Sequence, residues 1–329
     1  MTTSLVALVL AGGTGTRLYP ATNPDRPKQF LDFGGQRSLL ARTVSRTGFA
    51  DETYVLTRPD YADGVRDHAP RAGVLTEPEP KDTGPALVYA AHRIREQHGD
   101  CVLVVLPSDH AIEGDFASTA DTAARVADDT NGLVSIGVEP TRPATGYGYI
   151  VPAAFEDGFA PVDRFVEKPD ADSARRLLDT GALWNAGIFA WTPDAILDAA
   201  RDSSLASLVG ALEAGDAAAG FAAVDAVSVD DAILETAPNV FVVPAAFAWD
   251  DLGSWDALGR VLDTDDDGNA TLGETLAIDS EGCVLASDGH VSAIGVENLV
   301  VASFDGQTLV VPRAQAQRVR EVVDRRREK

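Results

Sequence analysis

A short apolar run that ends in a glycine-rich turn lies near the start of the chain. Residues Val6–Leu10 are continuously apolar, as expected for a strand covered on both faces, and Gly12, Gly13 and Gly15 follow almost directly. Glycines in such a turn let backbone N–H groups approach phosphate oxygens without side chains in the way. The pattern therefore predicts an α/β sheet with a phosphate-binding turn after its first strand.

The first 260 residues alternate short strand-like runs with longer helical patterns. This order predicts βα units and a mostly parallel, Rossmann-like sheet. The apolar run 101–106 ends at Pro107, which places Asp109 just beyond a central strand, where open α/β sheets bind ligands. The expected strands are 6–10, 54–57, 101–106 and 133–137, the expected helices are 82–97, 115–128, 171–178, 193–200 and 230–236, and a strand-and-loop insertion is expected over 143–168.

The character of the chain changes near residue 263. Residues 263–269 form an acidic, turn-rich linker, and short β-type segments follow at spacings of about 8–10 residues. We predict a domain over 1–262 and a small β-rich, β-helix-like domain over 263–329, with a final helix from Arg313. The expected strands of this second domain are 275–278, 283–286, 290–296, 299–303 and 308–311.

The chain is strongly acidic. It carries 27 Lys and Arg against 51 Asp and Glu, a formal net charge of −24. Such a surface repels phosphate backbones and anionic membranes, so neither nucleic acid nor membrane is an expected partner. High Asp with few Lys is also typical of proteins from very salty cytoplasm. The lysines are Lys28, Lys81, Lys168 and Lys329, and an anionic substrate requires a local basic pocket.

Other sequence features narrow the compartment and the chemistry. Cys101 and Cys283 are too far apart in sequence to suggest a disulfide framework, and they form no Cys-x-x-Cys site. The N-terminus lacks the features of a signal peptide, and no apolar stretch reaches 18 residues. We therefore expect a cytoplasmic protein. No nucleophile with a His and carboxylate, and no His-x-x-Glu-His, is evident.

The glycine-rich turn continues into a longer motif. It reads Leu10-Ala-Gly-Gly-Thr-Gly-Thr-Arg-Leu-Tyr-Pro20 and runs on to Pro27-Lys28-Gln29-Phe30. Arg17 and Lys28 supply the positive charge that an acidic protein must concentrate at a phosphate site. Leu18 replaces the third glycine of a dinucleotide fingerprint, and no Gly-Lys-Ser/Thr of a Walker loop follows.

This motif resembles the signature of the sugar-phosphate nucleotidylyltransferases, specifically the mannose-1-phosphate guanylyltransferases. Other segments between residues 5 and 260 are similar to that family's motifs and follow in its order. They are Glu77-Pro78 with Lys81–Ala86, Leu106–His110, Pro140–Ile150, Phe165–Pro169, Trp184–Gly187 and Trp249–Trp255. Lys81, Asp82 and Gly84 stand where the family usually has Arg, Asn and Ala, and Asp250 beside Asp251 leaves open which of the two binds metal.

The resemblance implies an enzyme that transfers GMP from GTP to mannose 1-phosphate, giving GDP-mannose and pyrophosphate, with Mg²⁺ as cofactor. A homodimer is left open. The implied catalytic residues are Arg17, Lys28, Asp109, Lys168 and Asp251, of which Asp109 and Asp251 would hold the metal. The implied nucleotide-binding residues are Leu10, Gly12, Gly13, Thr14, Gly15, Thr16, Arg17, Lys28, Lys81, Asp82, Gly84 and Ser108, and those for the sugar phosphate are Gly148, Glu167, Lys168 and Asn185.

Alternatives stay open at this point. The same chemistry with glucose 1-phosphate and UTP or dTTP is a near competitor, and a non-catalytic nucleotide-sugar binding protein is a competitor of another class. A bifunctional isomerase and transferase would need a further zinc-binding domain with more His residues. Single residues also have structural interpretations: Asp109 could cap a turn, Glu167 and Lys168 could be an exposed pair, Asn185 could be a turn residue and the tryptophans could be core.

Overall fold

The computed structural model describes residues 3–327, and the chain divides into two compact units. The first unit contains Met1–Gly12, Thr43–Ser108 and Ile112–Trp249, and the second contains Gly13–Arg42, Asp109–Ala111 and Asp250–Lys329. This division by packing does not follow the sequence boundary predicted at residues 262 and 263, because most of the glycine-rich motif packs with the C-terminal part of the chain. The division of the sequence into domains 1–262 and 263–329 therefore stays a prediction.

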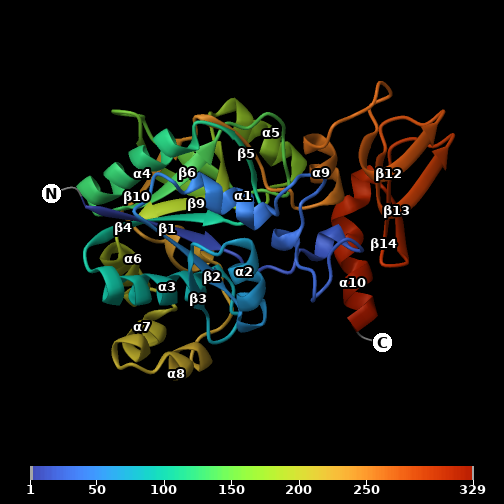
Figure 1. Cartoon of the computed structure of the whole chain (residues 1–329). Coiled ribbons are helices and arrows are strands. Elements are labelled where there is room, and N and C mark those ends of the chain that lie inside the picture. The colour runs from blue at the N-terminus through green and yellow to red at the C-terminus, as the bar shows by residue number, and fades with distance from the viewer. Residues whose placement is uncertain (1–2, 328–329) are drawn as a thin grey trace. The chain divides into compact units, whose positions relative to one another are not determined.

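The first unit is built on one mixed sheet (Figure 1). In sheet order its strands are β3 (Gly73–Thr76), β2 (Glu52–Thr57), β1 (Ser4–Leu10), β4 (Cys101–Pro107), β9 (Leu183–Trp191), β6 (Leu133–Val138), β10 (Val240–Pro244), β8 (Ala160–Val166) and β7 (Tyr149–Pro152). The run from β3 to β4 is parallel, and so is the pair β6–β10. The predicted α/β class is confirmed. Strand β9 was not expected, and it runs antiparallel to both β4 and β6.

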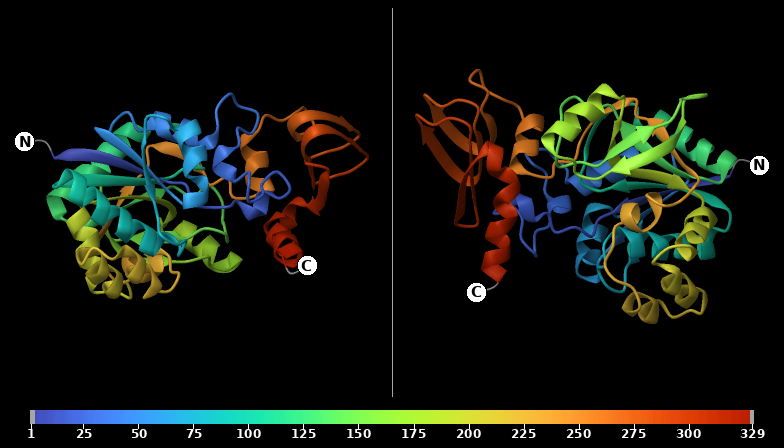
Figure 2. Two further views of the ribbon diagram at one scale, coloured as in Figure 1. Left: turned by 60° about the horizontal axis from the view of Figure 1, so that its bottom comes forward. Right: turned by 180° about the vertical axis from the view of Figure 1, so that it is seen from behind.

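Helices cover both faces of this sheet (Figures 1 and 2). Helix α4 (Phe116–Thr130) packs on one face, against β4, β6 and β9, while α3 (Thr83–His98) and α6 (Pro193–Arg201) pack together on the other. The N-cap residue of α4 is Asp115, whose carboxylate accepts a hydrogen bond from the Ser118 N–H. The other helical segments of the chain before residue 235 are η1 (Thr16–Leu18), η2 (Lys28–Phe30), α1 (Leu39–Arg46), η3 (Pro59–Tyr61), α2 (Ala62–His68), α5 (Ala171–Asp179), α7 (Ala206–Glu213), α8 (Ala217–Ala222) and the π-helix η4 (Asp230–Leu234).

The second unit contains a β-helix-like coil. Its strands are β12 (Ala270–Ile278), β13 (Val284–Ile294), β14 (Leu299–Phe304) and β15 (Gln307–Pro312). After the register shift that follows Leu272, parallel partners lie sixteen residues apart in sequence: Glu274 pairs with His290, and Val284 with Val300. This repeat is the length of one coil, so the predicted β-helix-like character is confirmed. The strands expected at 283–286 and 290–296 form the single strand β13.

The glycine-rich motif packs into the core of this second unit. Leu18 in η1 and Trp255 at the start of α9 (Trp255–Val261) are fully buried in the same apolar cluster. The Trp255 indole N–H donates to the Tyr19 carbonyl over 2.9 Å. Helix α10 (Val319–Arg327), which follows the 3-10 segment η5 (Arg313–Arg318), also packs on η1. The chain after Gly15 is therefore held by residues that lie more than 230 positions away.

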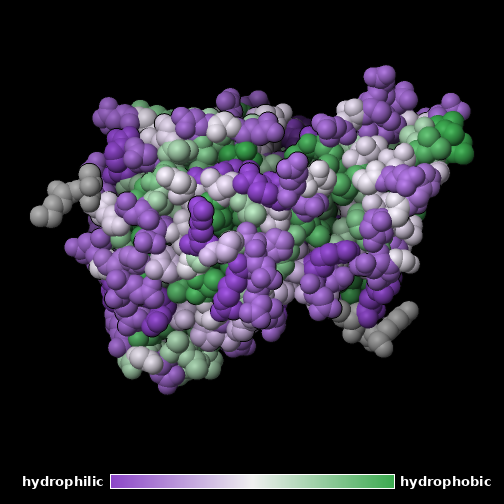
Figure 3. Space-filling model, viewed as in Figure 1, coloured by the Kyte–Doolittle hydropathy of each residue, from purple (hydrophilic) through white to green (hydrophobic). Residues whose placement is uncertain are grey.

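The surface in Figure 3 is mostly hydrophilic, in keeping with the net charge. An apolar patch lies where β12 and β13 end, and Leu276, Ile278 and Ile294 are exposed there. The remaining short strands, β5 (Ala111–Gly114) and β11 (Phe247–Asp250), pair with each other. Among the helices of the described residues, none is both long and apolar enough to cross a membrane.

Asn269 is expected to be a stability determinant of the second unit. It is fully buried, its side-chain oxygen accepts from the Cys283 N–H, and its amide donates to the Ser280 carbonyl. Asn269→Ala leaves both backbone groups unpaired, so we expect a loss of about 2–4 kcal/mol in the free energy of unfolding. Denaturant titration measures it, with the exposed Asp266→Ala as control. A loss no larger than that of the control would contradict this account.

Candidate active site

Several predicted nucleotide-binding residues lie at the carboxyl edge of the parallel strands in the first unit. Leu10 ends β1 and pairs with Pro107 at the end of β4. The Ser108 N–H then donates to the Leu10 carbonyl over 2.9 Å. Because parallel strands end at the same edge, Leu10, Gly12 and Ser108 are brought together where open α/β sheets bind ligands.

Lys28 is the centre of a charged cluster in the second unit. It is 4% exposed, and its ammonium lies 2.8 Å from Asp109 Oδ2 and donates to the Asp251 carbonyl over 2.7 Å. Burial opposes ionisation of Asp109, but the charge and hydrogen bond of Lys28, with a contribution from His110, hold the pKa of Asp109 below its usual range. Three of the five predicted catalytic residues therefore lie in direct contact.

Arg17 approaches the same cluster from the glycine-rich motif. A Cβ atom on Gly253 would collide with the Asp251 carboxylate and lie 3.1 Å from Arg17 Nη2, so the glycine leaves room for both groups. Arg17 also donates to Gln317 Oε1 over 2.9 Å. The structure thus brings Arg17, Lys28, Asp109 and Asp251 together.

The two neighbouring aspartates have different surroundings. Asp250 accepts from the Leu252 N–H and pairs with Arg260 over 2.8 Å. Burial nevertheless raises the pKa of Asp250. Since the Asp250 carboxylate already forms an ion pair with Arg260, the Asp251 carboxylate is the better candidate for a cation ligand.

The carboxylate oxygens near Lys28 are suitable ligands for a hard cation that also binds a substrate phosphate. Among the described residues, no group of three or more His, Cys, Asp and Glu side chains is placed to hold a metal ion. Asp109 and Asp251 offer two carboxylates. Mg²⁺ commonly takes one or two protein carboxylates and completes its shell with substrate phosphates and water, so this donor set fits that ion.

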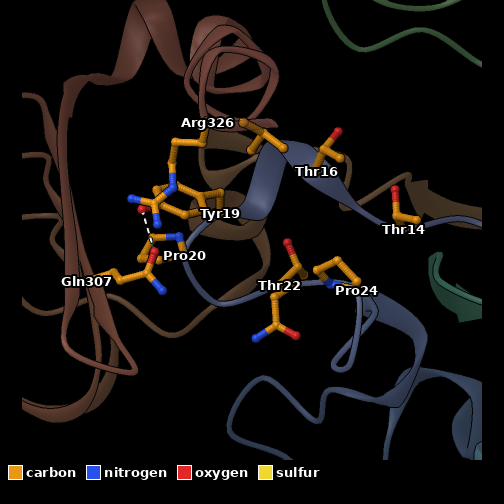
Figure 4. Close-up of a pocket in the computed structure, with 10 residues that line it drawn as sticks. Thr14, Thr16, Tyr19, Pro20, Thr22, Pro24, Gln307 and Arg326 are labelled. Atoms are coloured by element: carbon orange, nitrogen blue, oxygen red, sulfur yellow. Dashed lines mark hydrogen bonds between the residues drawn. The ribbon is translucent and has the colours of Figure 1, made fainter. Parts of the chain in front are cut away.

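A pocket of about 220 Å³ lies beside the glycine-rich motif within the second unit (Figure 4). Thr14 and Thr16 of the motif line it, and so do Tyr19 and Arg326, whose guanidinium stacks 5.5 Å from the Tyr19 ring. The Tyr19 hydroxyl donates to Gln307 Oε1 over 2.7 Å. The pocket is thus bordered by the hydroxyls of the motif and by a guanidinium from α10.

The residues predicted to bind the sugar phosphate meet in the first unit through strand register. Tyr149 on β7 pairs with Val166 on β8 and with Trp184 on β9. The residues next to these partners therefore share one end of the sheet. A Cβ on Gly148 would lie 2.6 Å from Glu167 Oε2 and 3.6 Å from the Asn185 Cβ. Asn185 lies in β9, and the turn interpretation of that residue is wrong.

Lys168 directly follows Glu167 and forms an ion pair with it. Its side chain is 63% exposed. Its φ of +40° is unusual for a residue other than glycine, and strained backbone of this kind occurs often at ligand-binding positions. The ammonium is available to an anionic ligand that comes from solvent.

Asp230 joins this group, although no sequence motif pointed to it. The Asn185 side-chain amide donates to Asp230 Oδ1 over 2.7 Å. Burial raises the pKa of Asp230 to about 6, the Asn185 hydrogen bond opposes that rise, and the charge of Glu167 adds to it. The sequence predicts a short helix at 230–236, but nothing in it indicates that the first carboxylate of this helix meets Asn185, so only the fold reveals this contact.

Aromatic rings stand next to the same group. Tyr147 packs edge-on against Trp184 and Trp249, with centroids 5.2 and 5.1 Å away. The Arg142 guanidinium lies over the rings of Tyr147 and Trp184. Tyr147 and Trp184 directly precede Gly148 and Asn185 in the sequence, and the cluster gives that end of the sheet an apolar wall with a cation on it.

The predicted nucleotide-binding residues Lys81, Asp82 and Gly84 are tied to other parts of the first unit. Lys81 donates to the carbonyls of Phe221 and Val224 over 2.7 and 2.9 Å, so its ammonium holds the end of α8. Asp82 caps α3 by accepting from the Thr83 N–H. Its predicted contact with a nucleotide, like that of Lys81, stays a prediction.

Gly84 and Glu77 complete this segment. A Cβ on Gly84 would lie 2.8 Å from the Val227 carbonyl, which already accepts from the Gly84 N–H, so glycine is needed there. Glu77 is 6% exposed, and its Oε1 lies 3.3 Å from the position of a Cβ on Gly12. Burial raises the pKa of Glu77 to about 7, although the charge of Arg58 opposes this.

The predicted site residues therefore fall into two sets, one in each unit. Those in the second unit are Gly13, Thr14, Gly15, Thr16, Arg17, Lys28, Asp109 and Asp251, and those in the first are Leu10, Gly12, Lys81, Asp82, Gly84, Ser108, Gly148, Glu167, Lys168 and Asn185. Within each set the charged or polar groups converge as described. Their individual roles remain predictions.

Comparison with known proteins identifies related families and chains. Residues 6–267 match the nucleotidyl transferase family, and residues 273–325 match the mannose-phosphate isomerase/GMP-like β-helix domain. The chain is 33% identical, over 97% of its length and 73% of the relative's, to a mannose-1-phosphate guanylyltransferase of Klebsiella pneumoniae. It is 34% identical, over 97% of its length and 72% of the relative's, to the xanthan biosynthesis protein XanB of Xanthomonas campestris.

A solved structure is similar over nearly the whole chain. It is a mannose-1-phosphate geranyltransferase from Thermus thermophilus, with a TM-score of 0.91 and 35% identity. The match covers 98% of this chain and 99% of that one. Both units therefore have counterparts in a single solved chain.

Glu77 predicts a dependence of stability on pH. With a pKa raised to about 7, the folded state keeps this proton while the unfolded chain loses it near its ordinary pKa of 4.5. The stabilisation is therefore complete below about pH 4.5 and is lost as the pH rises to about 7. Glu77→Gln should remove this fall and stabilise the fold at pH 8 by about 1–3 kcal/mol relative to wild type.

Denaturant unfolding between pH 5 and pH 8 tests this expectation. Glu79→Gln, two residues away and exposed, is the matched control and should leave the pH profile of the wild type unchanged. Parallel profiles for wild type and Glu77→Gln would show that the Glu77 carboxyl is not perturbed in this way.

Proposed function

We propose a specific reaction for this chain, which belongs to the nucleotidyl transferase family. In this proposal the enzyme transfers a nucleotidyl group to a sugar 1-phosphate and, more narrowly, makes GDP-mannose from GTP and mannose 1-phosphate. The choice of guanine and of mannose in this proposal rests on similarity: the match to the relative named mannose-1-phosphate guanylyltransferase covers 97% of the chain. Pyrophosphate is the second product.

One observation carries the proposal beyond family membership. In a chain with a net charge of −24, Arg17 and the buried Lys28 converge with Asp109 and Asp251 next to a glycine-rich backbone. Cations placed there attract a polyphosphate, and paired carboxylates are useful only if a cation accompanies that polyphosphate. A protein that merely bound a nucleotide sugar would not need both.

The reaction requires positioning rather than a protein nucleophile. An oxygen of the sugar phosphate attacks the α-phosphorus in line, and negative charge accumulates on the departing pyrophosphate. In the proposal, backbone N–H groups of residues 12–16 hold the triphosphate, and Arg17 neutralises the leaving group. Lys28 contacts the α-phosphate. Its ion pair with Asp109 would then weaken, which leaves the Asp109 carboxylate able to bind a cation.

A divalent cation completes the proposed chemistry. Asp109 and Asp251 would hold it, for the reasons of donor type given above, and when bound it supplies charge that offsets the phosphates. Asp250 is not assigned to it, since Arg260 occupies that carboxylate.

The sugar phosphate is assigned to the first unit. Lys168 binds its phosphate, Glu167 accepts from sugar hydroxyls, and Gly148 and Asn185 line the same pocket. The exposed ammonium of Lys168 and the convergence of Gly148, Glu167 and Asn185 support this assignment.

The proposed function is tested by pairing each of the four nucleoside triphosphates with several sugar 1-phosphates and measuring pyrophosphate release with Mg²⁺ at high KCl. We expect GTP with mannose 1-phosphate to give the highest kcat/KM, by about tenfold or more over other pairs. Highest activity with UTP or dTTP and glucose 1-phosphate would assign the other substrate pair. No release with any pair would indicate a non-catalytic binder.

Lys168→Ala should separate the two substrates. Losing one charged contact to the sugar phosphate is expected to raise KM for mannose 1-phosphate about 10- to 100-fold while KM for GTP changes less than about threefold. Steady-state kinetics with each substrate varied in turn provide the measurement. Arg164→Ala removes an exposed cation of β8 nearby and should leave both constants near wild type. An equal loss for both substrates would exclude the assignment.

A further inference from the structure

The side chain of Asp230 has no evident role in stabilising the fold. It begins the π-helix η4, but its side chain does not cap that helix, whose N-cap residue is Val229. π-Helical turns are rare and occur often at functional sites. Among the side chains that the structure describes, no Lys, Arg or His forms an ion pair with Asp230.

The position of Asp230 is fixed by its one side-chain donor. Asn185 accepts from the Gly187 N–H over 3.0 Å and from the Ser135 hydroxyl over 3.4 Å through the same oxygen. These contacts direct the amide nitrogen toward Asp230 Oδ1, 2.7 Å away. Ser135 is fully buried, so Asn185 is anchored in the sheet and holds the carboxyl in place.

Ionising Asp230 in these surroundings is unfavourable unless a ligand donates hydrogen bonds to its carboxylate. Burial and the nearby charge of Glu167 raise the pKa of Asp230 to about 6. A buried carboxyl next to a second carboxyl, with no cation paired to it in the described part of the chain, is not an arrangement that stabilises a fold by itself. A carboxylate accepts about four hydrogen bonds, so the one from Asn185 leaves capacity for further donors.

The surroundings indicate which donors these are. The carboxyls of Glu167 and Asp230 offer acceptors, Trp184 precedes Asn185, and Lys168 supplies a charge of opposite sign. A ligand with several neutral hydroxyl donors and one anionic group matches this set. A second cation is a poorer match, since Lys168 already pairs with Glu167.

We propose that Asp230 accepts a hydrogen bond from a hydroxyl group of the bound hexose and, together with Glu167, determines which sugar 1-phosphate the protein selects. This inference rests on the proposed function, since it takes the sugar 1-phosphate to bind at Glu167 and Lys168. It adds a specificity-determining residue that none of the sequence motifs contains.

The test measures binding directly, apart from turnover. Trp184 and Trp249 lie in the aromatic cluster beside the group, so their fluorescence reports a titration with mannose 1-phosphate. Wild type is compared with Asp230→Asn and Asp230→Ala. The matched control is Asp231→Asn, which removes the neighbouring exposed carboxylate. We expect Kd to rise about 10- to 100-fold for both Asp230 variants and less than about twofold for the control.

Analogues that lack one hydroxyl distinguish a direct contact from a structural role. Wild type is titrated with the 2-, 3-, 4- and 6-deoxy forms of mannose 1-phosphate. For the analogue without the contacted hydroxyl, wild type should lose about 10- to 100-fold in Kd, while Asp230→Ala should lose no more than about twofold relative to its own Kd for mannose 1-phosphate. The other analogues should weaken both proteins alike.

The outcomes separate this inference from the proposed function. If Asp230→Ala distinguishes every deoxy analogue as wild type does, or if wild type binds no sugar 1-phosphate, the inference is overturned. If wild type binds the sugar phosphate but releases no pyrophosphate with any nucleotide, the proposed reaction fails while the role of Asp230 is still decided by the analogues. Should Asp230→Ala not fold, the same comparison with Asp230→Asn decides it.

Discussion

The buried ammonium group of Lys28 is the interaction on which the second unit's charged cluster depends. It connects the glycine-rich motif to Asp109 through an ion pair and to the Asp251 backbone through a hydrogen bond, so residues from three distant stretches of chain are fixed around one atom. These partners offset the cost of burying the ammonium at 4% exposure. The chain has four lysines. One of them, Lys28, is buried beside acidic residues, so positive charge can be confined to one small region of a strongly acidic chain.

Local patterns predicted a large part of the first unit. The apolar runs of β1 and β4 and the helix α3 follow from side chains close in sequence, and the structure has them. Strand β9 was missed because Asn185 and Gly187 interrupt its apolar pattern. Asn185 instead reaches Asp230 and Ser135, and the strand is held by β4 and β6 on both sides rather than by its own composition.

The candidate site was less accessible to sequence reasoning, because burial and packing decide its chemistry. Glu77 and Asp230 are ordinary acidic residues in the sequence, and burial, with a smaller contribution from nearby acidic charges, raises their pKa values to about 7 and about 6. The packing of Leu18 with Trp255 is equally non-local, and no periodicity reveals that residues 13–42 belong with the C-terminal coil. The resemblance to family motifs identified the candidate site residues. The fold then showed that the Lys81 ammonium donates hydrogen bonds to two backbone carbonyls.

One short segment of the first unit connects the predicted nucleotide-binding residues Lys81 and Gly84 with the group formed by Asn185 and Asp230. Lys81 binds the carbonyls of Phe221 and Val224, and the Gly84 N–H binds that of Val227. Shortly after Val227, in the same segment, Asp230 meets Asn185. Because a Cβ on Gly84 would come within 2.8 Å of the Val227 carbonyl, a larger residue there would displace the segment and, with it, the carboxyl of Asp230. The contacts that fix Lys81 and Gly84 therefore also restrain the backbone segment that carries Asp230, so the two groups of side chains are not structurally independent.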